Sequence, residues 1–365
     1  MLVIGAGSGA GNNLIRSLRA GDPSIVVIGC HDDRFTLKKS SADRNHLLPR
    51  GADPAFIEAL RRVVKVESVD LVIPNSDFDV RIVSRRRKRL PCRVFLPGHA
   101  VIELCQDKYR LSAFLASRGV PVPRTYPVTS RRAVAGICRR LGRGARVWCR
   151  IREGSGSRGA VPVASTEQAL NWLKFWEEMR GVPPTAFTLA EYLPGRDFAC
   201  QSLWKDGNLV LIKTCERISY FGGGSQPSGA SSIAALAKTV VEPRVVEVCA
   251  EAIRALDSRV TGAFSVDLKE NVRGVPCITE INVGRFITLM NFFDLTGKHN
   301  MTATYVRLAF DEPVTISDSY DTAEDYYFVR DVDTVPGIFH ADDFLEDIHD
   351  ARRSRAPRTS SAGGR

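Results

Sequence analysis

The sequence lacks the features of a membrane or exported protein. None of its apolar runs approaches the roughly eighteen residues that a membrane-spanning helix needs. Residues 1–5 have the pattern of a strand rather than of a charged and then apolar leader. The nine cysteines include no C-x-x-C pair and no grouping with histidine at metal-ligand spacing, so we expect reduced, mostly buried thiols. These absences predict a cytoplasmic protein that does not contact membranes.

Aromatic residues are scarce where the positive charge is dense. The formal net charge is +10, and much of it comes from residues 85–89 and from the arginines after Asp350. A base-stacking surface needs aromatic side chains among the cations, and these runs have none. We therefore expect no nucleic-acid partner, with binding of other polyanions as the alternative. Residues 349–365 have too little apolar surface to fold, which predicts a disordered basic tail.

The first hundred residues alternate between helical and strand patterns. Apolar runs at 2–4 and 25–29 flank a helical pattern from about residue 13, and the alternation continues to residue 97. This order predicts an open, mostly parallel sheet. Residues 5–11 are glycine-rich, and Asp32 follows the second run, which imitates a dinucleotide-binding fingerprint. The alternative is a tight strand-to-helix turn that binds nothing.

A second glycine-rich stretch lies between two strands. Asp107 and Lys108 open a helix that residues 119–123, with one glycine and two prolines, bring to an end. The strand 146–151, the loop 154–159 and the strand 160–163 follow. Backbone N–H groups of such a loop can fold over phosphate oxygens, to which Arg158 adds charge. A flexible hairpin turn is the alternative.

The chain continues with a mixture of helices and strands. Residues 166–179 predict an amphipathic helix with Thr166 as N-cap. Residues 199–204 and 209–214 predict paired strands, and the loop 221–225 is a candidate for closing over substrate. Helices are expected near 245–255 and 301–310, and an edge strand at 326–330.

Residues 261–285 predict a β-hairpin whose acids meet on one face. Two alternating apolar runs flank a turn at 270–274 that contains Asn and Gly. Glu280 and Asn282 share a face of one strand, and Asp267 can face them from the other. Three hard oxygen ligands suit Mg²⁺. The alternative is a set of ordinary solvated acids.

The ordered set of these motifs resembles the ATP-grasp superfamily, in the branch similar to one half of the carbamoyl phosphate synthase large chain. The resemblance covers about residues 1–310 and implies an α/β fold: a Rossmann-like N-terminal (pre-ATP-grasp) domain at 1–103, then a two-lobed ATP-grasp domain at 104–320 with its lid at about 145–190. A strand and helix extension would occupy 321–348.

The resemblance also implies roles for individual residues. ATP would lie between two sheets, with Mg²⁺, or Mn²⁺ in its place, held by Asp267, Glu280 and Asn282. The nucleotide-binding residues would be Lys108, Arg150, Ser155, Gly156, Ser157, Gly159, Glu191, Tyr192, Leu193 and Asp197. Glu191 and the backbone near Leu193 would hold adenine, and Asp197 the ribose. Arg285 and Arg217 would hold the substrate carboxylate, with Arg158 on the glycine loop.

Two positions depart from the usual family pattern. Many ATP-grasp enzymes have lysine where this chain has Arg150, although the carbamoyl phosphate synthase branch can use arginine. The motif Glu280-Ile281-Asn282-Val283-Gly284-Arg285 replaces the more usual Glu-Ile-Asn-Pro-Arg, which moves the arginine by one position.

The function implied is an ATP- and Mg²⁺-dependent carboxylate–amine ligase that acts through an acyl phosphate on small-molecule carboxylate and amine substrates. The alternatives are phosphorylation of bicarbonate or carbamate, a nicotinamide-dependent oxidoreductase, and a protein that binds ATP without turnover. A homodimer is open, since the family allows it but no feature of the sequence requires it.

Overall fold

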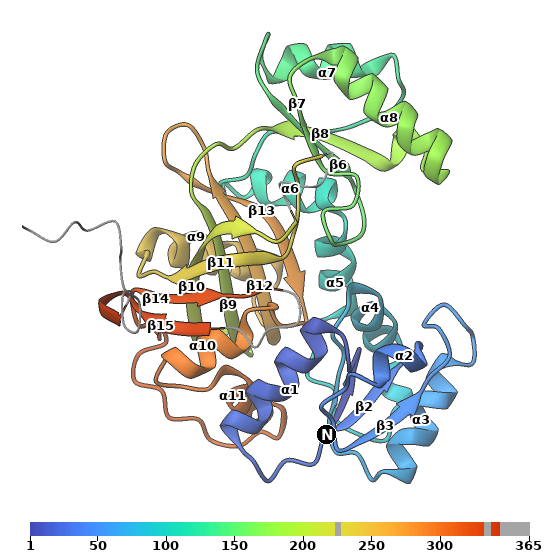
Figure 1. Cartoon of the computed structure of the whole chain (residues 1–365), viewed down its shortest axis with the longest axis vertical. Coiled ribbons are helices and arrows are strands. Elements are labelled where there is room, and N and C mark those ends of the chain that lie inside the picture. Colours follow the sequence, from blue (N-terminus) through green and yellow to red (C-terminus); the bar gives the residue numbers. More distant parts are fainter. Residues whose placement is uncertain (223–227, 332–336, 344–365) are drawn as a thin grey trace, which may run out of the picture.

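The computed structural model describes residues 1–222, 228–331 and 337–343, and in it the chain forms three lobes (Figure 1). Most of the expected loop at 221–225, residues 344–348 of the expected extension and the expected tail at 349–365 lie outside the described residues. In the described part, no helix is long and apolar enough to span a membrane. The nine cysteines are free thiols, all buried or half-buried, as expected.

The first lobe is a four-stranded parallel sheet with strand order β3-β2-β1-β4. Its strands are β1 (Leu2–Ile4), β2 (Ile28–His31), β3 (Arg44–Leu47) and β4 (Val72–Ile73). Its helices are α1 (Gly9–Gly21), α2 (Arg34–Leu37), α3 (Phe56–Val66), α4 (Asp77–Arg86) and the short 3₁₀ turn η1 (Arg87–Arg89). Strands β1, β2 and β4 are almost wholly buried, as apolar runs in a parallel sheet require. The predicted parallel sheet is confirmed.

The glycine-rich turn before α1 is packed against protein. Gly7 has φ of +82°, and a Cβ there would lie 1.9 Å from the carbonyl oxygen of Thr36. A Cβ on Gly11 would lie 2.2 Å from the carbonyl oxygen of Gly5. Two aspartates follow β2: the carboxylate of Asp32 lies 3.0 Å from Nδ1 of His31, and the neighbouring Asp33 caps α2. The glycines are therefore explained by close backbone approach within the lobe.

Two helices lead out of the first lobe. They are α5 (His99–Gln106) and α6 (Lys108–Ser117). The carboxylate of Asp107 accepts hydrogen bonds from the N–H groups of Tyr109 and Arg110 at 3.1 and 3.0 Å, so it is the N-cap of α6. The predicted helix start at Asp107 and Lys108 is confirmed. The boundary expected at residue 103 falls inside α5.

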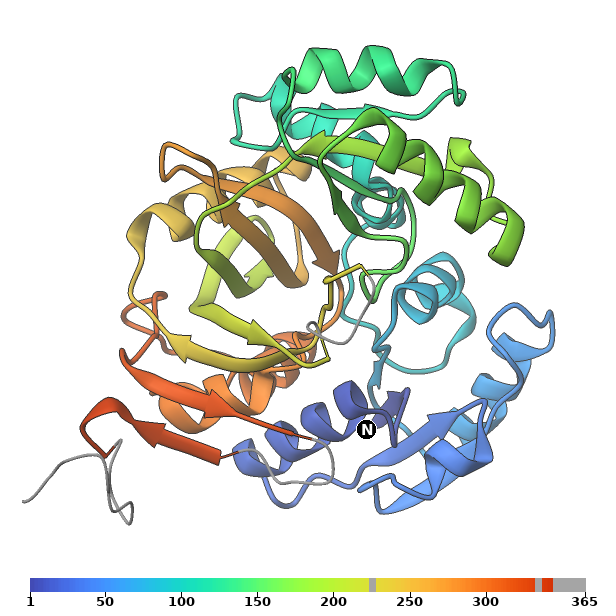
Figure 2. The ribbon, with the colours of Figure 1, turned by 45° about the horizontal axis from the view of Figure 1, so that its top comes forward.

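The second lobe is a seven-stranded antiparallel sheet with strand order β13-β12-β9-β10-β11-β14-β15. Its strands are β9 (Asp197–Lys205), β10 (Asn208–Tyr220), β11 (Ala234–Thr239), β12 (Gly262–Glu270), β13 (Pro276–Val283), β14 (Tyr326–Val329) and β15 (Gly337–His340). Its helices are α9 (Pro243–Leu256), α10 (Met290–Thr296) and α11 (Met301–Ala309), and the turn η4 (Ala341–Asp343) follows β15. Figure 2 shows how strongly this sheet curves.

The C-terminal strands belong to this large sheet. β14 pairs with β11 on one side and β15 on the other, so the strand expected at the edge is internal, and β15 takes the edge. The buried carboxylate of Asp321 forms an ion pair with the ammonium of Lys213 on β10 at 3.0 Å. The strands β14 and β15, which follow Asp321, thus complete the large sheet.

The third lobe is the lid, a four-stranded antiparallel sheet with strand order β5-β8-β6-β7. Its elements are β5 (Thr125–Pro127), α7 (Ala133–Leu141), β6 (Val147–Ile151), β7 (Val161–Val163), α8 (Thr166–Arg180), η2 (Pro184–Ala186) and β8 (Phe187–Glu191). The lid therefore begins at residue 125, earlier than the expected 145, because β5 pairs with β8. The N-cap of α8 is Ser165, whose hydroxyl accepts from the N–H of Gln168, and not Thr166 as predicted.

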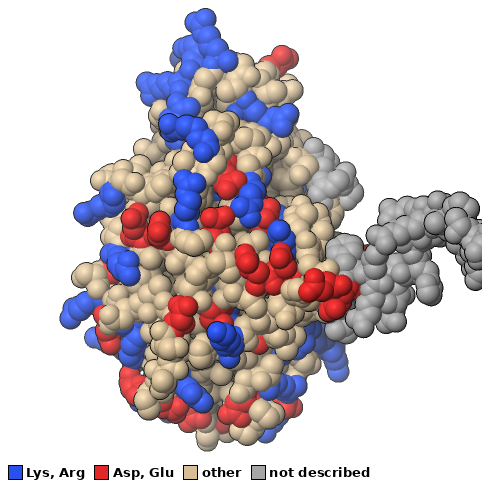
Figure 3. Space-filling model, turned by 90° about the vertical axis from the view of Figure 1, so that its left-hand side faces the viewer, with Lys and Arg blue, Asp and Glu red and all other residues tan. Residues whose placement is uncertain are grey.

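The lid has its own apolar core, and its two chain connections to the body lie side by side. Its core includes Val147, Leu173 and Phe187, whereas residues of the first and second lobes share common clusters. The N–H of Glu191 donates to the carbonyl oxygen of Arg124 at 2.9 Å. The chain therefore enters and leaves the lid at two residues that are neighbours in space. Figure 3 shows basic side chains gathered at the lid end of the molecule, with both signs of charge mixed elsewhere on that face.

Candidate active site

A cavity of about 550 Å³ lies between the large sheet and the lid. All of the predicted site residues except Gly159 line it. They are Lys108, Arg150, Ser155, Gly156, Ser157, Arg158, Glu191, Tyr192, Leu193, Asp197, Arg217, Asp267, Glu280, Asn282 and Arg285. The fold therefore brings together residues that lie as far apart in the sequence as Lys108 and Arg285.

The hairpin of β12 and β13 places its acids side by side. Asp267 is directly opposite Glu280, and Ser265 is opposite Asn282, with a register shift immediately after Asp267. The side-chain amide of Asn282 donates to Oδ2 of Asp267 at 3.1 Å. The predicted hairpin and the convergence of the three side chains are confirmed.

Arg217 links two of the acids. Its guanidinium donates to Oδ1 of Asp267 at 2.8 Å and to Oδ1 of Asp197 at 2.7 and 2.9 Å. The hydroxyl of Tyr220 donates to Oδ2 of Asp197 at 2.6 Å. The predictions place a substrate carboxylate at Arg217 and the ribose near Asp197, and in the structure these two side chains are paired with each other. The reason is that β10 and β12 flank β9, so Arg217, Asp197 and Asp267 come from three adjacent strands.

The two facing carboxylates have opposite pKa shifts. Burial raises the pKa of Asp267, and the neighbouring Arg217 offsets only part of that effect. Burial acts on Glu280 in the same sense, but the charges of Lys108, Arg150 and Arg285 outweigh it and lower the pKa of Glu280. The ammonium of Lys108 lies 3.3 Å from Oε1 of Glu280.

Arg150 is a buried cation from the lid. One of its terminal nitrogens donates to the carbonyl oxygen of Thr279 at 2.8 Å, while its Nε has no hydrogen-bond partner among the described residues. Burial lowers the pKa of Arg150, and the charges of Glu280 and Asp267 act against this effect. A buried donor without a partner is costly, so this side chain is arranged to meet an acceptor.

The loop between β6 and β7 is held by Lys108, whose ammonium donates to the carbonyl oxygen of Gly154. Gly154, Gly156 and Ser157 adopt positive φ angles of 109°, 77° and 52°. Gly159 does not face the cavity. A Cβ on Gly159 would lie 2.8 Å from Cγ1 of Ile151, so this glycine allows the end of the loop to pack on the lid core.

The segment after β8 forms the outer wall of the cavity. The carboxylate of Glu191 pairs with the guanidinium of Arg124 at 3.1 Å. The guanidinium of Arg146 lies over the ring of Tyr192, 5.2 Å from its centre. Leu193 is buried.

Arg285 joins the hairpin to the first lobe. Its guanidinium forms an ion pair with Asp77 on α4 at 2.9 Å and donates to Oδ1 of Asn282. Gly284 has φ of +71°, and a Cβ there would lie 2.7 Å from Cδ2 of Leu96. The unusual Val-Gly-Arg order therefore lets the chain pass close to the first lobe and present Arg285 there.

Sequence reasoning missed several residues that line or adjoin the cavity. Trp148 and Tyr220 line the cavity, and Asp77 forms an ion pair with Arg285, another lining residue. The alternation along the strand at 146–151 could have revealed Trp148. Tyr220 follows a bulge between Arg217 and Tyr220, and Asp77 belongs to another lobe, so neither left a signal in the sequence.

The metal-ligand expectation rests on two carboxylates and one amide. In the described residues, no group of three or more His, Cys, Asp or Glu side chains is placed to hold a metal ion. Asp267, Glu280 and Asn282 supply oxygen atoms at paired and adjacent strand positions, which is chemistry that suits Mg²⁺.

A three-lobed α/β chain with a lid sheet over an antiparallel sheet has the ATP-grasp fold, and solved structures bear this out. Biotin carboxylase from Campylobacter jejuni, in a β,γ-ATP complex, is 15% identical with a TM-score of 0.68 over 90% of this chain and 74% of that one. The biotin carboxylase domain dimer of the 2-oxoglutarate carboxylase from Hydrogenobacter thermophilus, with MgADP, ADP and bicarbonate, is 16% identical with a TM-score of 0.67, over 90% and 73%. An L-amino acid ligase from Bacillus licheniformis is 14% identical with a TM-score of 0.63, over 90% and 78%.

No protein-family model matches the sequence, and a search of curated proteins finds no match. The likeness is therefore one of fold. The particular resemblance to the carbamoyl phosphate synthase large chain stays a prediction.

Proposed function

We propose that this protein is an ATP- and Mg²⁺-dependent carboxylate–amine ligase that forms an acyl phosphate. The observation that carries the proposal is the pairing of Asp267 with Glu280, beside Asn282, opposite a glycine loop and the buried cations Lys108 and Arg150. The solved structures of similar fold include proteins crystallised with ATP or MgADP and an amino acid ligase.

The cavity has the groups that binding of a nucleoside triphosphate requires. Lys108 and the partnerless Nε of Arg150 would donate to phosphate oxygens, and the backbone of residues 154–157 would cover them. Adenine would lie at Glu191 and Leu193. Asp197, already bonded to Arg217 and Tyr220, would accept from the ribose with its remaining lone pairs.

Asp267, Glu280 and Asn282 would hold Mg²⁺, or Mn²⁺ in its place. The ion would neutralise negative charge on the phosphates. In the structure Glu280 contacts Lys108, so Lys108 would turn from Glu280 to a phosphate when nucleotide and metal bind. Arg217 holds Asp267 and Asp197 in position, which makes it a positioning residue for both sites.

Arg285 would bind the substrate carboxylate. An oxygen of that carboxylate attacks the γ-phosphorus of ATP, the bond to the β-phosphate oxygen breaks, and ADP leaves. The amine then attacks the acyl carbon, and the bond from carbon to the phosphate oxygen breaks. The protein contributes position and charge rather than a nucleophile of its own. Arg158 would bring further positive charge when the loop closes.

The test is ADP release from ATP and Mg²⁺ across a matrix of amino acids and other carboxylates, with and without amines. A carboxylate that stimulates ADP release, and an amine that converts it to an amide, is the expected result. If ATP binds but no acid stimulates ADP release, the protein binds ATP without turnover. Thermal protection by NAD(P)H but not by ATP with Mg²⁺ would favour the oxidoreductase.

Bicarbonate is the second candidate for the phosphoryl acceptor. It is favoured by one observation, the bicarbonate bound in the carboxylase domain of similar fold. ADP release that depends on bicarbonate, and not on organic acids, would decide for this alternative.

A further inference from the structure

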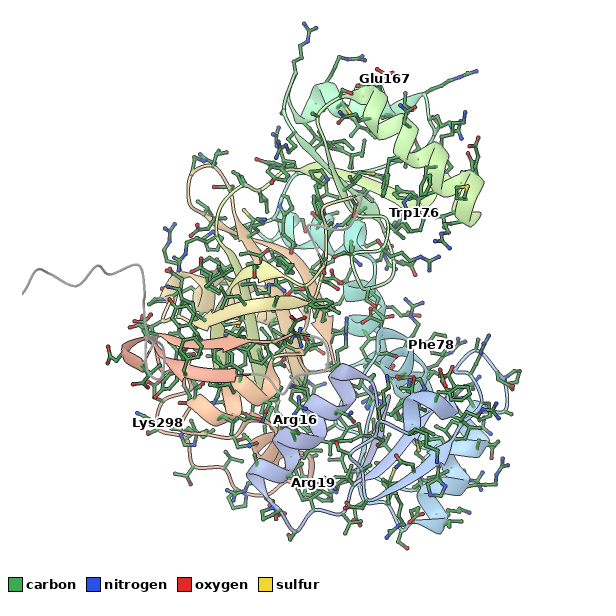
Figure 4. The ribbon with its side chains drawn as sticks, in the orientation of Figure 1. Arg16, Arg19, Phe78, Glu167, Trp176 and Lys298 are labelled. Atoms are coloured by element: carbon green, nitrogen blue, oxygen red, sulfur yellow. The ribbon has the colours of Figure 1, made fainter. Side chains whose placement is uncertain are left out.

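A second cavity of about 410 Å³ lies between the lid and the first lobe. Ser76, Asp77 and Phe78, at the start of α4, form one wall, and Ile151, Arg158 and Val182 form the other. Gly154 and Ser155 line both cavities, so the glycine loop is their common wall. Figure 4 shows Phe78 on the first lobe and Trp176 on the lid helix α8. The guanidinium of Arg158 lies over the ring of Trp176.

We propose that this second cavity binds the amine substrate and selects a primary amine that carries a compact apolar group. The inference rests on the proposed function, because it assigns a substrate class to the same reaction. It goes beyond that function in naming the entrance and the residues that discriminate between amines.

The apolar part of the cavity is prepared for contact. Phe78 is 46% exposed. Part of its ring packs against Gly51, since a Cβ built on Gly51 would lie 2.2 Å from Cε1 of the ring. The rest of the ring is open to contact with a ligand. Ile151 and Val182 are half-buried on the opposite wall. An apolar group between them would lose its contact with water on both sides.

The cavity also has one carboxylate that a cationic ligand can reach. Asp77 is already paired with Arg285 at 2.9 Å, and Arg158 supplies a guanidinium that lies 5.8 Å from the ring centre of Trp176. Glu153 keeps 56% of its side chain exposed, and its ion pair with Arg81 is long, at 3.4 Å. An ammonium group of the amine substrate would pair with Glu153, whereas a carboxylate on the substrate would have to give up its water against the apolar walls.

The contact between Asp77 and Arg285 joins the two cavities. Asp77 lines the second cavity, and its partner Arg285 lines the first, where it would hold the carboxylate. An amine bound beside Asp77 is therefore adjacent to the acyl carbon. The new carbon–nitrogen bond forms as the carbon–oxygen bond to phosphate breaks. Of the two protons that the ammonium loses, one passes through Glu153 to solvent and the other leaves with the phosphate.

The test separates the two steps by using hydroxylamine as a small nucleophile. Hydroxylamine converts any acyl phosphate to a hydroxamate without needing the apolar wall. Phe78→Ala, Glu153→Gln and the wild type are compared with Phe35→Ala, which removes an exposed phenylalanine of the same lobe that lines neither cavity. Amide formation is measured with amines of matched size that are apolar, hydroxylated or acidic.

We expect the wild type to prefer the apolar amine. We expect Phe78→Ala to raise the KM for the apolar amine about tenfold, because the variant loses an apolar contact with this substrate. Hydroxamate formation and the KM for ATP should not change. Glu153→Gln should raise the KM for every amine, and Phe35→Ala should behave as wild type. Preference for an acidic amine, or equal KM values in Phe78→Ala and wild type, overturns the inference alone. A wild type that forms no hydroxamate from any carboxylate removes the proposed function as well.

Discussion

Two carboxylates that face each other across β12 and β13 have different electrostatic surroundings. Asp267 forms an ion pair with the guanidinium of Arg217, and burial raises the pKa of this carboxylate. Three cations surround Glu280, and they lower its pKa despite burial. Glu280 is thus held ionised by charges that the nucleotide phosphates would attract, so binding of nucleotide would free it for a metal ion.

Replacement of Glu280 should separate folding from turnover. We expect Glu280→Gln to reduce ADP release by at least about a hundredfold, because the amide lacks the charge that a divalent cation requires. The fold should persist, since the amide has the same shape. Turnover is measured as ADP release, and folding by circular dichroism and thermal unfolding. Glu251→Gln, on the exposed side of α9, is the matched control. A wild-type rate in Glu280→Gln would remove the metal site from the proposal.

Asp294 should make stability depend on pH. Burial raises its pKa to about 7, and its carboxylate accepts from the N–H of Met301 at 2.7 Å. A raised folded-state pKa means that the folded protein holds the proton more tightly than the unfolded chain. The resulting stabilisation is complete below the unfolded-state pKa and is lost as the pH rises through about 7.

We therefore expect the free energy of unfolding of the wild type to fall by roughly 1 kcal/mol between about pH 6 and pH 8, relative to Asp294→Asn. The amide keeps the acceptor for Met301 and cannot ionise. Urea unfolding across this pH range measures the difference, with the exposed Asp343→Asn as control. Parallel pH profiles for wild type and Asp294→Asn would contradict the assignment.

At the scale of elements, two glycines of the lid loop should respond differently to the same change. Gly156 and Gly159 have similar φ angles of 77° and 68°, but a Cβ meets nothing within 4 Å at Gly156 and lies 2.8 Å from Ile151 at Gly159. We expect Gly156→Ala to cost about 1 kcal/mol of stability, from its backbone conformation, and Gly159→Ala about 2–3 kcal/mol because of the added clash. Denaturant unfolding compares the two variants. Equal losses would show that packing at Gly159 does not matter.

The sequence predicted the elements with strong local signals. The hairpin around Asp267 followed from alternation and from an Asn and Gly turn, and the start of α6 from a capping aspartate. β5 is three residues long and includes a proline, so it has no period to detect, and the beginning of the lid was misplaced. β11 is rich in alanine, and only its pairing with β10 and β14 makes it a strand.

The sequence predicted most of the residues that line the candidate site, but not the contacts that these residues make with one another. Motifs identified fifteen of the lining residues because each motif is local. Contacts between lobes left no such signal, and the ion pairs of Arg217 with Asp197 and of Arg285 with Asp77 depend on how distant strands and helices meet.

At the scale of the whole molecule, the segment after α11 is tied into the large sheet by a buried ion pair. The ammonium of Lys213 is 1% exposed and also donates to the carbonyl oxygens of Phe293 and His299. We expect Asp321→Ala to cost about 3–5 kcal/mol, because it leaves a buried cation without its counter-charge. Asp318→Ala, at an exposed position three residues earlier, should cost less than about 1 kcal/mol. Urea unfolding measures both, and similar midpoints for the two variants would argue against this anchor.

The adjacency of Arg124 and Glu191 has an evolutionary consequence. Because the lid leaves and rejoins the body at residues that are neighbours in space, and carries its own core, replacement of the segment between residues 124 and 191 could exchange it for the lid of another protein of this fold. The body would keep Asp267, Glu280 and Arg285, while the new lid would bring a different glycine loop. Closure of the glycine loop over the nucleotide and selection of the substrate could thus be inherited from different ancestors.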